Sequence, residues 1–234
     1  MKELNEKQLI ELLREDLKLP KKKTKSKVNE NYTVQTQNYR LPTELLSEKT
    51  KKAHQKIMED HAASLNWIAS NLAAVNRDEV QNSNNSKFRG LKIDEVYNLN
   101  ASFLHSMFFE NISDVNSKVT VDSLAHMKLS RDFGDFDSWQ KDFIACALSS
   151  RSGWVVTVYN TFLGKYMNVV CDLHSSNIPF SSIPVIVLDC WEHSYYKDYV
   201  NDSKSYVYAM MKELDWNVIE SRFEKTEKVV KVMK

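Results

Sequence analysis

The feature that most restricts the fold of this chain is a change in sequence periodicity at Gly153. Before this residue, apolar side chains recur mainly at helical spacing, whereas the segment after it is rich in β-branched and aromatic residues. Three strands are predicted over residues 154–162, 166–173 and 183–191, and a short glycine-containing turn makes the first two antiparallel. Helices followed by a small sheet indicate an α+β fold: an N-terminal hairpin of long helices, then a three-stranded antiparallel sheet with flanking helices.

The helical part of the chain carries start signals that define its organisation. Ser47 is placed to cap a long helix over residues 48–75, and a polar break at 81–87 separates it from a second helix over about 92–112. Further helices are predicted over residues 120–130, 135–149 and 193–216. We therefore divide the chain into an N-terminal arm, a helical hairpin domain and an α/β domain, which cover residues 1–40, 41–115 and 116–234.

The N-terminal arm differs in composition from the rest of the chain. Leu9, Leu13 and Leu17 recur at helical spacing and predict a short amphipathic helix over residues 4–18. The basic run LPKKKTKSK and a polar linker up to residue 40 follow this helix. Two interpretations remain open: the arm is a solvated tail, or it docks to an unknown protein partner.

The composition of the chain argues against several classes of protein. A net charge of +1 over 234 residues makes general attraction to nucleic acid unexpected, and no apolar run approaches the length of a membrane span. Four glycines leave no glycine-rich phosphate loop, and three cysteines without CxxC spacing suggest no disulfide framework. Because the N-terminus also lacks a signal-peptide core, we expect a cytoplasmic protein or part of a larger intracellular assembly.

The stretch DCWEHSYY at residues 189–196 holds the strongest candidate for a functional site. Asp189 and His193 lie where the third predicted strand ends and a helix begins, a rigid position from which to present ligands. His54 and His105 lie on the two long helices. A single histidine on an apolar helix face is more often a core residue than a ligand. Three histidines and one aspartate on separate rigid elements together suit a mid-row transition metal, and zinc is possible on ligand type alone.

Several segments resemble the iron/manganese superoxide dismutases. The stretch DCWEHSYYKDYVN, which begins at Asp189, is similar to the carboxy-terminal signature of that family. Weaker similarities occur in FGDFDSWQKDFIACALSSRSGW at 133–154, in HSMFFENI at 105–112, and in the Leu-Pro pair and Ser-x-x-Thr-x-x-x-His pattern within 41–54. The resemblance covers about residues 41 to 223.

This resemblance implies a metal-dependent enzyme that converts superoxide to oxygen and hydrogen peroxide by alternating M(III) and M(II). It implies one iron or manganese ion per chain, held by His54, His105, Asp189 and His193. It further implies that Trp154 and Trp191 wall the metal pocket. His174, which follows Trp154 by twenty positions, would then donate a hydrogen bond to metal-bound solvent.

The same resemblance implies a homodimer. Glu192 would reach across the interface to the partner's His193, and Tyr196 would lie near the same interface. Superoxide would be the small-molecule partner. The composition, as stated above, predicts no membrane contact and makes binding to nucleic acid unexpected.

The chain departs from the family pattern at the substrate channel. Met58 and Ala62 stand four and eight residues after His54, where the family has a histidine and a tyrosine. His61 lies two helical turns after His54, and it is either an alternative first ligand or a substitute channel histidine. These departures leave a second hypothesis open beside an active dismutase: a structural or assembly protein of the same fold with reduced or no activity. A metal-binding oxidoreductase with other chemistry is a third, weaker reading.

Overall fold

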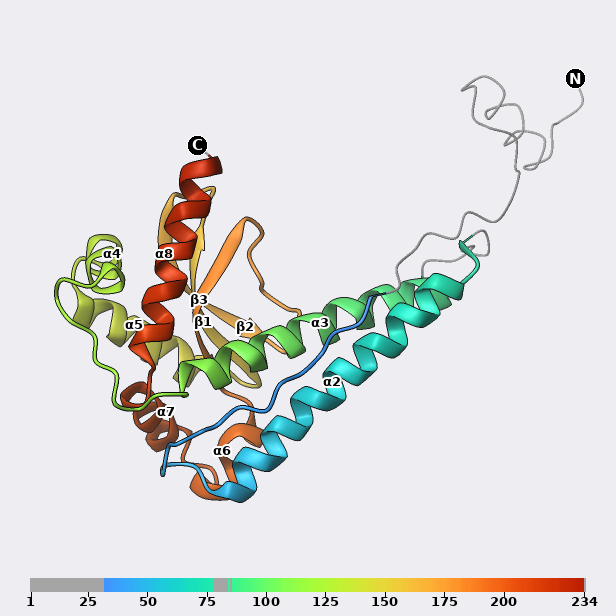
Figure 1. Cartoon of the computed structure of the whole chain (residues 1–234), viewed down its shortest axis with the longest axis horizontal. Coiled ribbons are helices and arrows are strands. Elements are labelled where there is room, and N and C mark those ends of the chain that lie inside the picture. Colours follow the sequence, from blue (N-terminus) through green and yellow to red (C-terminus); the bar gives the residue numbers. More distant parts are fainter. Residues whose placement is uncertain (1–31, 78–83, 85, 234) are drawn as a thin grey trace, which may run out of the picture.

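A computed structural model describes residues 32–77, 84 and 86–233 (Figure 1). The predicted amphipathic helix over 4–18 and the basic run lie outside these residues. The described chain contains helices and one small antiparallel sheet, so the predicted α+β class is confirmed. Within the described chain, no helix is both long and apolar enough to cross a bilayer.

Two long helices form the N-terminal hairpin. Helix α2 spans Glu48–Ala74, and the hydroxyl of Ser47 accepts a hydrogen bond from the Thr50 amide, which confirms the predicted cap. Helix α3 spans Lys87–Asn111 and begins five residues before the predicted start. The early start has a local cause, because Ser86, inside the segment assigned as a polar break, caps this helix through the Arg89 amide. Figure 1 shows the hairpin extending away from the sheet.

The sheet has the strand order β2-β1-β3, with β1 antiparallel to both neighbours. The three strands are β1 (Gly153–Asn160), β2 (Lys165–Asp172) and β3 (Ser182–Asp189), close to the predicted ranges. Trp154 pairs with Cys171 on one side and with Asp189 on the other. This register places the Trp154 backbone beside the one acid of the candidate site.

Helices cover the sheet and enclose the main core. The remaining helices of the α/β part are α4 (Leu124–Phe133), α5 (Phe136–Ser149), α6 (Glu192–Tyr199), α7 (Ser203–Lys212) and α8 (Trp216–Met233). Helix α5 packs on β1 and β2, and α8 packs on β3. Trp139 and Phe143 from α5 are fully buried with Phe223 from α8, and the Trp139 indole donates to the Thr157 hydroxyl at 3.0 Å.

One predicted helix needs correction, and one observed helix was not predicted. The range 193–216 is not one helix, because the chain is interrupted between α6 and α7, where Val200 has a positive φ of +55°. Asp202 then caps α7 through the Ser205 amide. Helix α8 was not predicted, although Ile219, Phe223, Thr226 and Val230 are buried at helical spacing and could have indicated it.

Candidate metal centre

Four side chains from distant parts of the chain meet at the junction between the hairpin and the sheet. They are His54 from α2, His105 from α3, Asp189 from the end of β3 and His193 from α6. One donor atom from each residue lies within 4.8 Å of all the others. His54, His105 and Asp189 are buried, and His193 is partly exposed. The sequence predicted this set of four, and the structure brings all of them together.

The distances suit a single ion bound among the four donors. Oδ2 of Asp189 lies 2.9 Å from Nε2 of His54, 3.2 Å from that of His193 and 3.6 Å from that of His105. The Nε2 atoms of His105 and His193 are 3.4 Å apart. Donors bound to one transition-metal ion at about 2.0–2.2 Å are separated by about 3–4 Å. The observed cluster therefore fits a metal ion.

Surrounding hydrogen bonds orient the donors. Nδ1 of His105 lies 2.6 Å from the Ala101 carbonyl, which only accepts, so Nδ1 carries the hydrogen and the Nε2 lone pair is available for a ligand. Asp189 is held in a similar way. Its Oδ1 accepts from the Trp191 amide at 2.8 Å, and its carbonyl accepts from the Tyr206 hydroxyl at 2.9 Å. Oδ2 is left facing the three imidazoles.

The electrostatics of the cluster favour a bound cation. Burial by itself would raise the pKa of Asp189, but His193 and His54 hold it well below its usual range through charge interactions and hydrogen bonds. Burial lowers the pKa of His54, and burial together with the His54 charge lowers that of His105. The cluster thus offers an ionised carboxylate and two buried neutral imidazoles, which is donor chemistry that suits a transition-metal site.

Two tryptophans and His174 surround the four donors. The Trp154 ring meets His105 edge-on, with centroids 4.9 Å apart, and its indole donates to Nδ1 of His174 at 3.0 Å. His174 stacks on Trp191 at 4.9 Å, and Trp191 stacks on His193 at 5.7 Å. Burial and the nearby His61 lower the pKa of His174 to about 4. The predicted aromatic walls and His174 thus lie in contact with the cluster.

His61 lies beside the four-donor cluster and is not part of it. Its Nδ1 contacts Oδ1 of Asn98 at 2.9 Å, and because Asn98 Nδ2 donates to the Asp94 carbonyl, Oδ1 is the acceptor. The His61 ring lies 5.0 Å from that of His174 and 5.7 Å from that of His105. Of the two alternatives on α2, His54 is the one that reaches Asp189.

Two further residues lie near the site, and Tyr97 was missed from the sequence. Tyr97 lies two helical turns before His105 on α3, and its ring contacts that of His174 at 4.7 Å. Phe109 contacts the His54 ring at 4.8 Å. The helical spacing from His105 was the signal that could have indicated Tyr97. Met58 and Ala62, at the channel positions of the family pattern, are buried in the packing of the hairpin.

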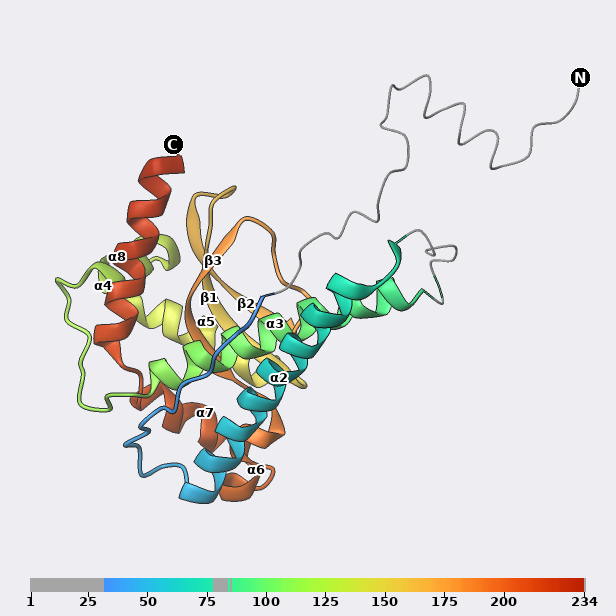
Figure 2. The same ribbon diagram turned by 45° about the vertical axis from the view of Figure 1, so that its right-hand side comes forward.

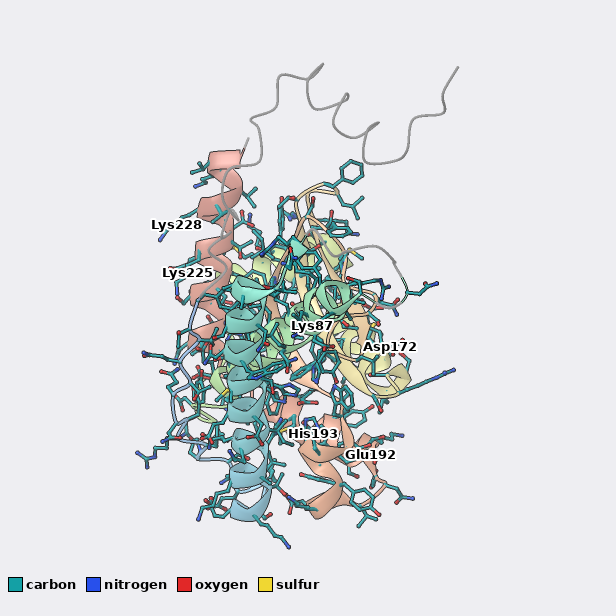
Figure 3. The ribbon with its side chains drawn as sticks, turned by 90° about the vertical axis from the view of Figure 1, so that its right-hand side faces the viewer. Lys87, Asp172, Glu192, His193, Lys225 and Lys228 are labelled. Carbon is teal, nitrogen blue, oxygen red and sulfur yellow. The ribbon has the colours of Figure 1, made fainter. Side chains whose placement is uncertain are left out.

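Glu192 and Tyr196 are the outermost of the predicted site residues. Figure 3 shows Glu192 beside His193 at the start of α6. Glu192 is exposed, and Tyr196 is 54% exposed. Their side chains are therefore available at the surface of the single chain.

Comparisons with known proteins relate the chain to one family. A family model described as iron/manganese superoxide dismutases, C-terminal domain, matches residues 122–222. The chain is similar to superoxide dismutase [Mn] 1 of Halobacterium salinarum, with 35% identity over 56% of this chain and 64% of the relative. It is similar to superoxide dismutase [Fe] of Aquifex aeolicus, with 31% identity over 78% of this chain and 84% of the relative. It thus spans under two thirds of the haloarchaeal relative and most of the Aquifex protein.

Proposed function

Because this chain belongs to the iron/manganese superoxide dismutase family, we propose that it is a metal-dependent superoxide dismutase. Its substrate would be superoxide, and one iron or manganese ion per chain would be held by His54, His105, Asp189 and His193. The observation that carries this proposal is the meeting of these four buried or half-buried donors within 4.8 Å.

The bound metal would supply one-electron chemistry, alternating between M(III) and M(II), by which two superoxide anions and two protons give oxygen and hydrogen peroxide. In the loaded site, Asp189 would contribute the one negative charge of the donor set, so a bound M(II) or M(III) ion would leave the site cationic toward an anionic substrate. Trp154 and Trp191 exclude bulk water from one side.

We assign His174 as the residue that donates a hydrogen bond to solvent at the metal. The Trp154 indole occupies Nδ1, so a neutral His174 carries its hydrogen on Nε2 and presents a donor there. His61 and Tyr97, whose rings both contact His174, would form the polar channel lining that Met58 and Ala62 do not provide. In this proposal His61 is a channel residue and His54 is the ligand.

We also propose a homodimer in which Glu192 pairs with the partner's His193 and Tyr196 lies at the same interface. The exposure of Glu192 and Tyr196 beside His193 supports this arrangement. Sedimentation analysis of the parent and of Glu192→Ala tests it. A dimer that becomes a monomer in the variant is expected, whereas a monomeric parent would contradict the proposal.

A second candidate function is a structural or assembly protein of this fold with reduced or no activity. The burial of Met58 and Ala62 at the channel positions favours it, because neither side chain supplies a polar group there. The N-terminal arm would then dock to an unknown protein partner. Removal of residues 1–31 discriminates the two functions: activity should persist if the protein is an enzyme, and assembly should be lost if it is structural.

The cysteines support an intracellular setting for either function. Cys146, Cys171 and Cys190 are all unpaired, as expected in a reducing compartment. We therefore propose a cytoplasmic location, with the protein alone or within a larger intracellular assembly.

The decisive experiment measures metal content and superoxide consumption on the same purified sample. The parent is compared with two variants. Asp189→Asn removes the charge of the carboxylate donor at the end of β3, and Asp60→Asn removes an exposed carboxylate on α2, away from the cluster. About one iron or manganese per chain with activity is expected for the parent and Asp60→Asn, and neither is expected for Asp189→Asn. Metal without activity would favour the structural function, and no metal after reconstitution would refute the enzyme.

A further inference from the structure

Residues 32–40, here called the strap, run in extended conformation along the hairpin (Figure 2). Two amide side chains of α2 hold the strap by its backbone. Asn66 accepts from the Val34 amide at 2.7 Å and donates to the Val34 carbonyl at 2.9 Å. Gln55 does the same for Tyr39, at 2.8 and 3.1 Å. Each amide group therefore satisfies both backbone groups of one strap residue, as a neighbouring strand would.

The spacing of these two amide clamps matches the geometry of the two segments. Gln55 and Asn66 are eleven positions apart, which is about 16 Å along an α-helix. Val34 and Tyr39 are five positions apart, which is about 16 Å along an extended chain. The strap runs antiparallel to α2. Asn66 and Gln55 can therefore both make their pairs of hydrogen bonds to the strap without bending of either segment. This match in length indicates that the strap has one defined position on the hairpin.

The strap is also tied to α3. The Tyr32 hydroxyl donates to Glu95 at 2.8 Å, and the Tyr39 hydroxyl shares a short hydrogen bond with the Ser106 hydroxyl. The strap thus contacts both helices near each of its ends. Because it is hydrogen-bonded to both helices at each end, it opposes sliding of α2 along α3.

One end of the strap lies directly behind the metal centre. Gln55 follows His54 in the sequence, and Ser106 follows His105. The Tyr39 ring packs against Phe109 with centroids 5.4 Å apart, and Phe109 packs against His54 at 4.8 Å. Tyr39 therefore contacts a neighbour of each helical donor without touching either donor.

We propose that the strap sets the separation of the two helical metal donors, with Tyr39 as a positioning residue for the metal centre. A bound ion requires donors within a few tenths of an ångström of fixed separations, so a contact that fixes α2 against α3 contributes to metal affinity. This inference rests on the proposed function, because it requires that His54 and His105 bind a metal.

The test compares manganese affinity among full-length variants by competition with a chelator. Tyr39→Phe removes the hydroxyl bond to Ser106 and keeps the ring. Tyr32→Phe is the matched control, because it removes a tyrosine hydroxyl bond at the other end of the strap. We expect the Kd for Mn²⁺ to rise about three- to tenfold in Tyr39→Phe, as for loss of one hydrogen bond, and to stay within twofold in Tyr32→Phe.

A double-mutant cycle locates the effect in the Tyr39–Ser106 contact. Ser106→Ala should raise the Kd as much as Tyr39→Phe, and the double variant should bind no more weakly than either single variant. The electron paramagnetic resonance spectrum of bound Mn²⁺ should change in Tyr39→Phe, while the melting temperature of the metal-free protein should fall no further than in Tyr32→Phe, which also loses one hydrogen bond. A purely structural role would lower the melting temperature and leave the spectrum unchanged.

The possible failures are distinguishable. A parent protein that binds neither manganese nor iron would overturn the proposed function and this inference with it. A parent that binds metal, with an unchanged Kd in Tyr39→Phe or an equal rise in Tyr32→Phe, would overturn the role of Tyr39 alone. Additive effects of Tyr39→Phe and Ser106→Ala would have the same consequence.

Discussion

The indole of Trp154 donates a hydrogen bond of 3.0 Å to Nδ1 of His174, and this bond determines which nitrogen of the imidazole carries hydrogen. An indole nitrogen only donates, so the neutral His174 ring must hold its own hydrogen on Nε2. Burial lowers the pKa of His174 to about 4, which keeps the ring neutral near pH 7. The pair therefore presents one fixed donor beside the four-donor cluster.

Replacement of Trp154 by Phe should reduce activity more than metal content. The indole bond is lost, the His174 ring is free to change tautomer, and loss of such a supporting contact typically costs about tenfold or more. Metal analysis and the superoxide assay on Trp154→Phe measure both effects. Trp67→Phe, at a tryptophan that is 62% exposed on α2, is the control and should match the parent. Parental activity in Trp154→Phe would contradict the role of His174.

Alanine variants of His54 and His61, both on α2, should show which histidine binds the metal and which lines the channel. His54→Ala removes the Nε2 atom that lies 2.9 Å from Asp189, so bound metal should fall at least tenfold. His61→Ala should keep its metal and lose activity, because His61 contacts His174 and Asn98 and lies outside the four-donor cluster. Elemental analysis of both proteins decides the assignment. The reverse pattern would identify His61 as the ligand.

Removal of the metal should lower the melting temperature. In the metal-free protein, three imidazoles surround one buried carboxylate, and no bound cation balances the charge of that carboxylate. Metal at a hundred times its Kd stabilises by about 2.7 kcal/mol, which corresponds to roughly 5–10 °C for a chain of this size. Calorimetry with and without added Mn²⁺ measures the shift. Asp189→Asn should show no shift, and an equal shift in that variant would point to binding elsewhere.

The three thiols should react at different rates in the native protein. Burial raises the pKa of Cys171 to about 11, and burial holds that of Cys190 higher still. Because only the thiolate reacts, both should resist a thiol reagent at pH 8. Cys146 is half-buried, and its pKa is raised less, so it should react first. Timed labelling followed by mass spectrometry checks the order, and fast labelling of Cys190 would contradict the packing of β3.

Local patterns in the sequence predicted the elements that depend on local interactions. The cap at Ser47 and the β-branched runs of the three strands determine short-range hydrogen bonds and strand pairing, and both were confirmed. The break between α6 and α7 was not predicted, because the positive φ at Val200 occurs with no glycine to signal it.

Contacts between distant segments were harder to predict. The strap is held by single amide side chains at Gln55 and Asn66, which produce no periodic pattern in residues 32–40. The choice between His54 and His61 was also open in the sequence, since both lie near one face of α2. The position of Asp189 relative to α2 favours His54, and that position depends on the packing of the sheet against the hairpin.

The separation of the donors along the chain has a consequence for biosynthesis. His54 and Asp189 are 135 residues apart, and the fourth donor follows on α6. The hairpin, with its two histidines, therefore emerges from the ribosome well before the acid and the last histidine have been synthesised. An incomplete nascent chain presents only half of the donor set, so the full four-donor cluster exists only after translation has passed α6.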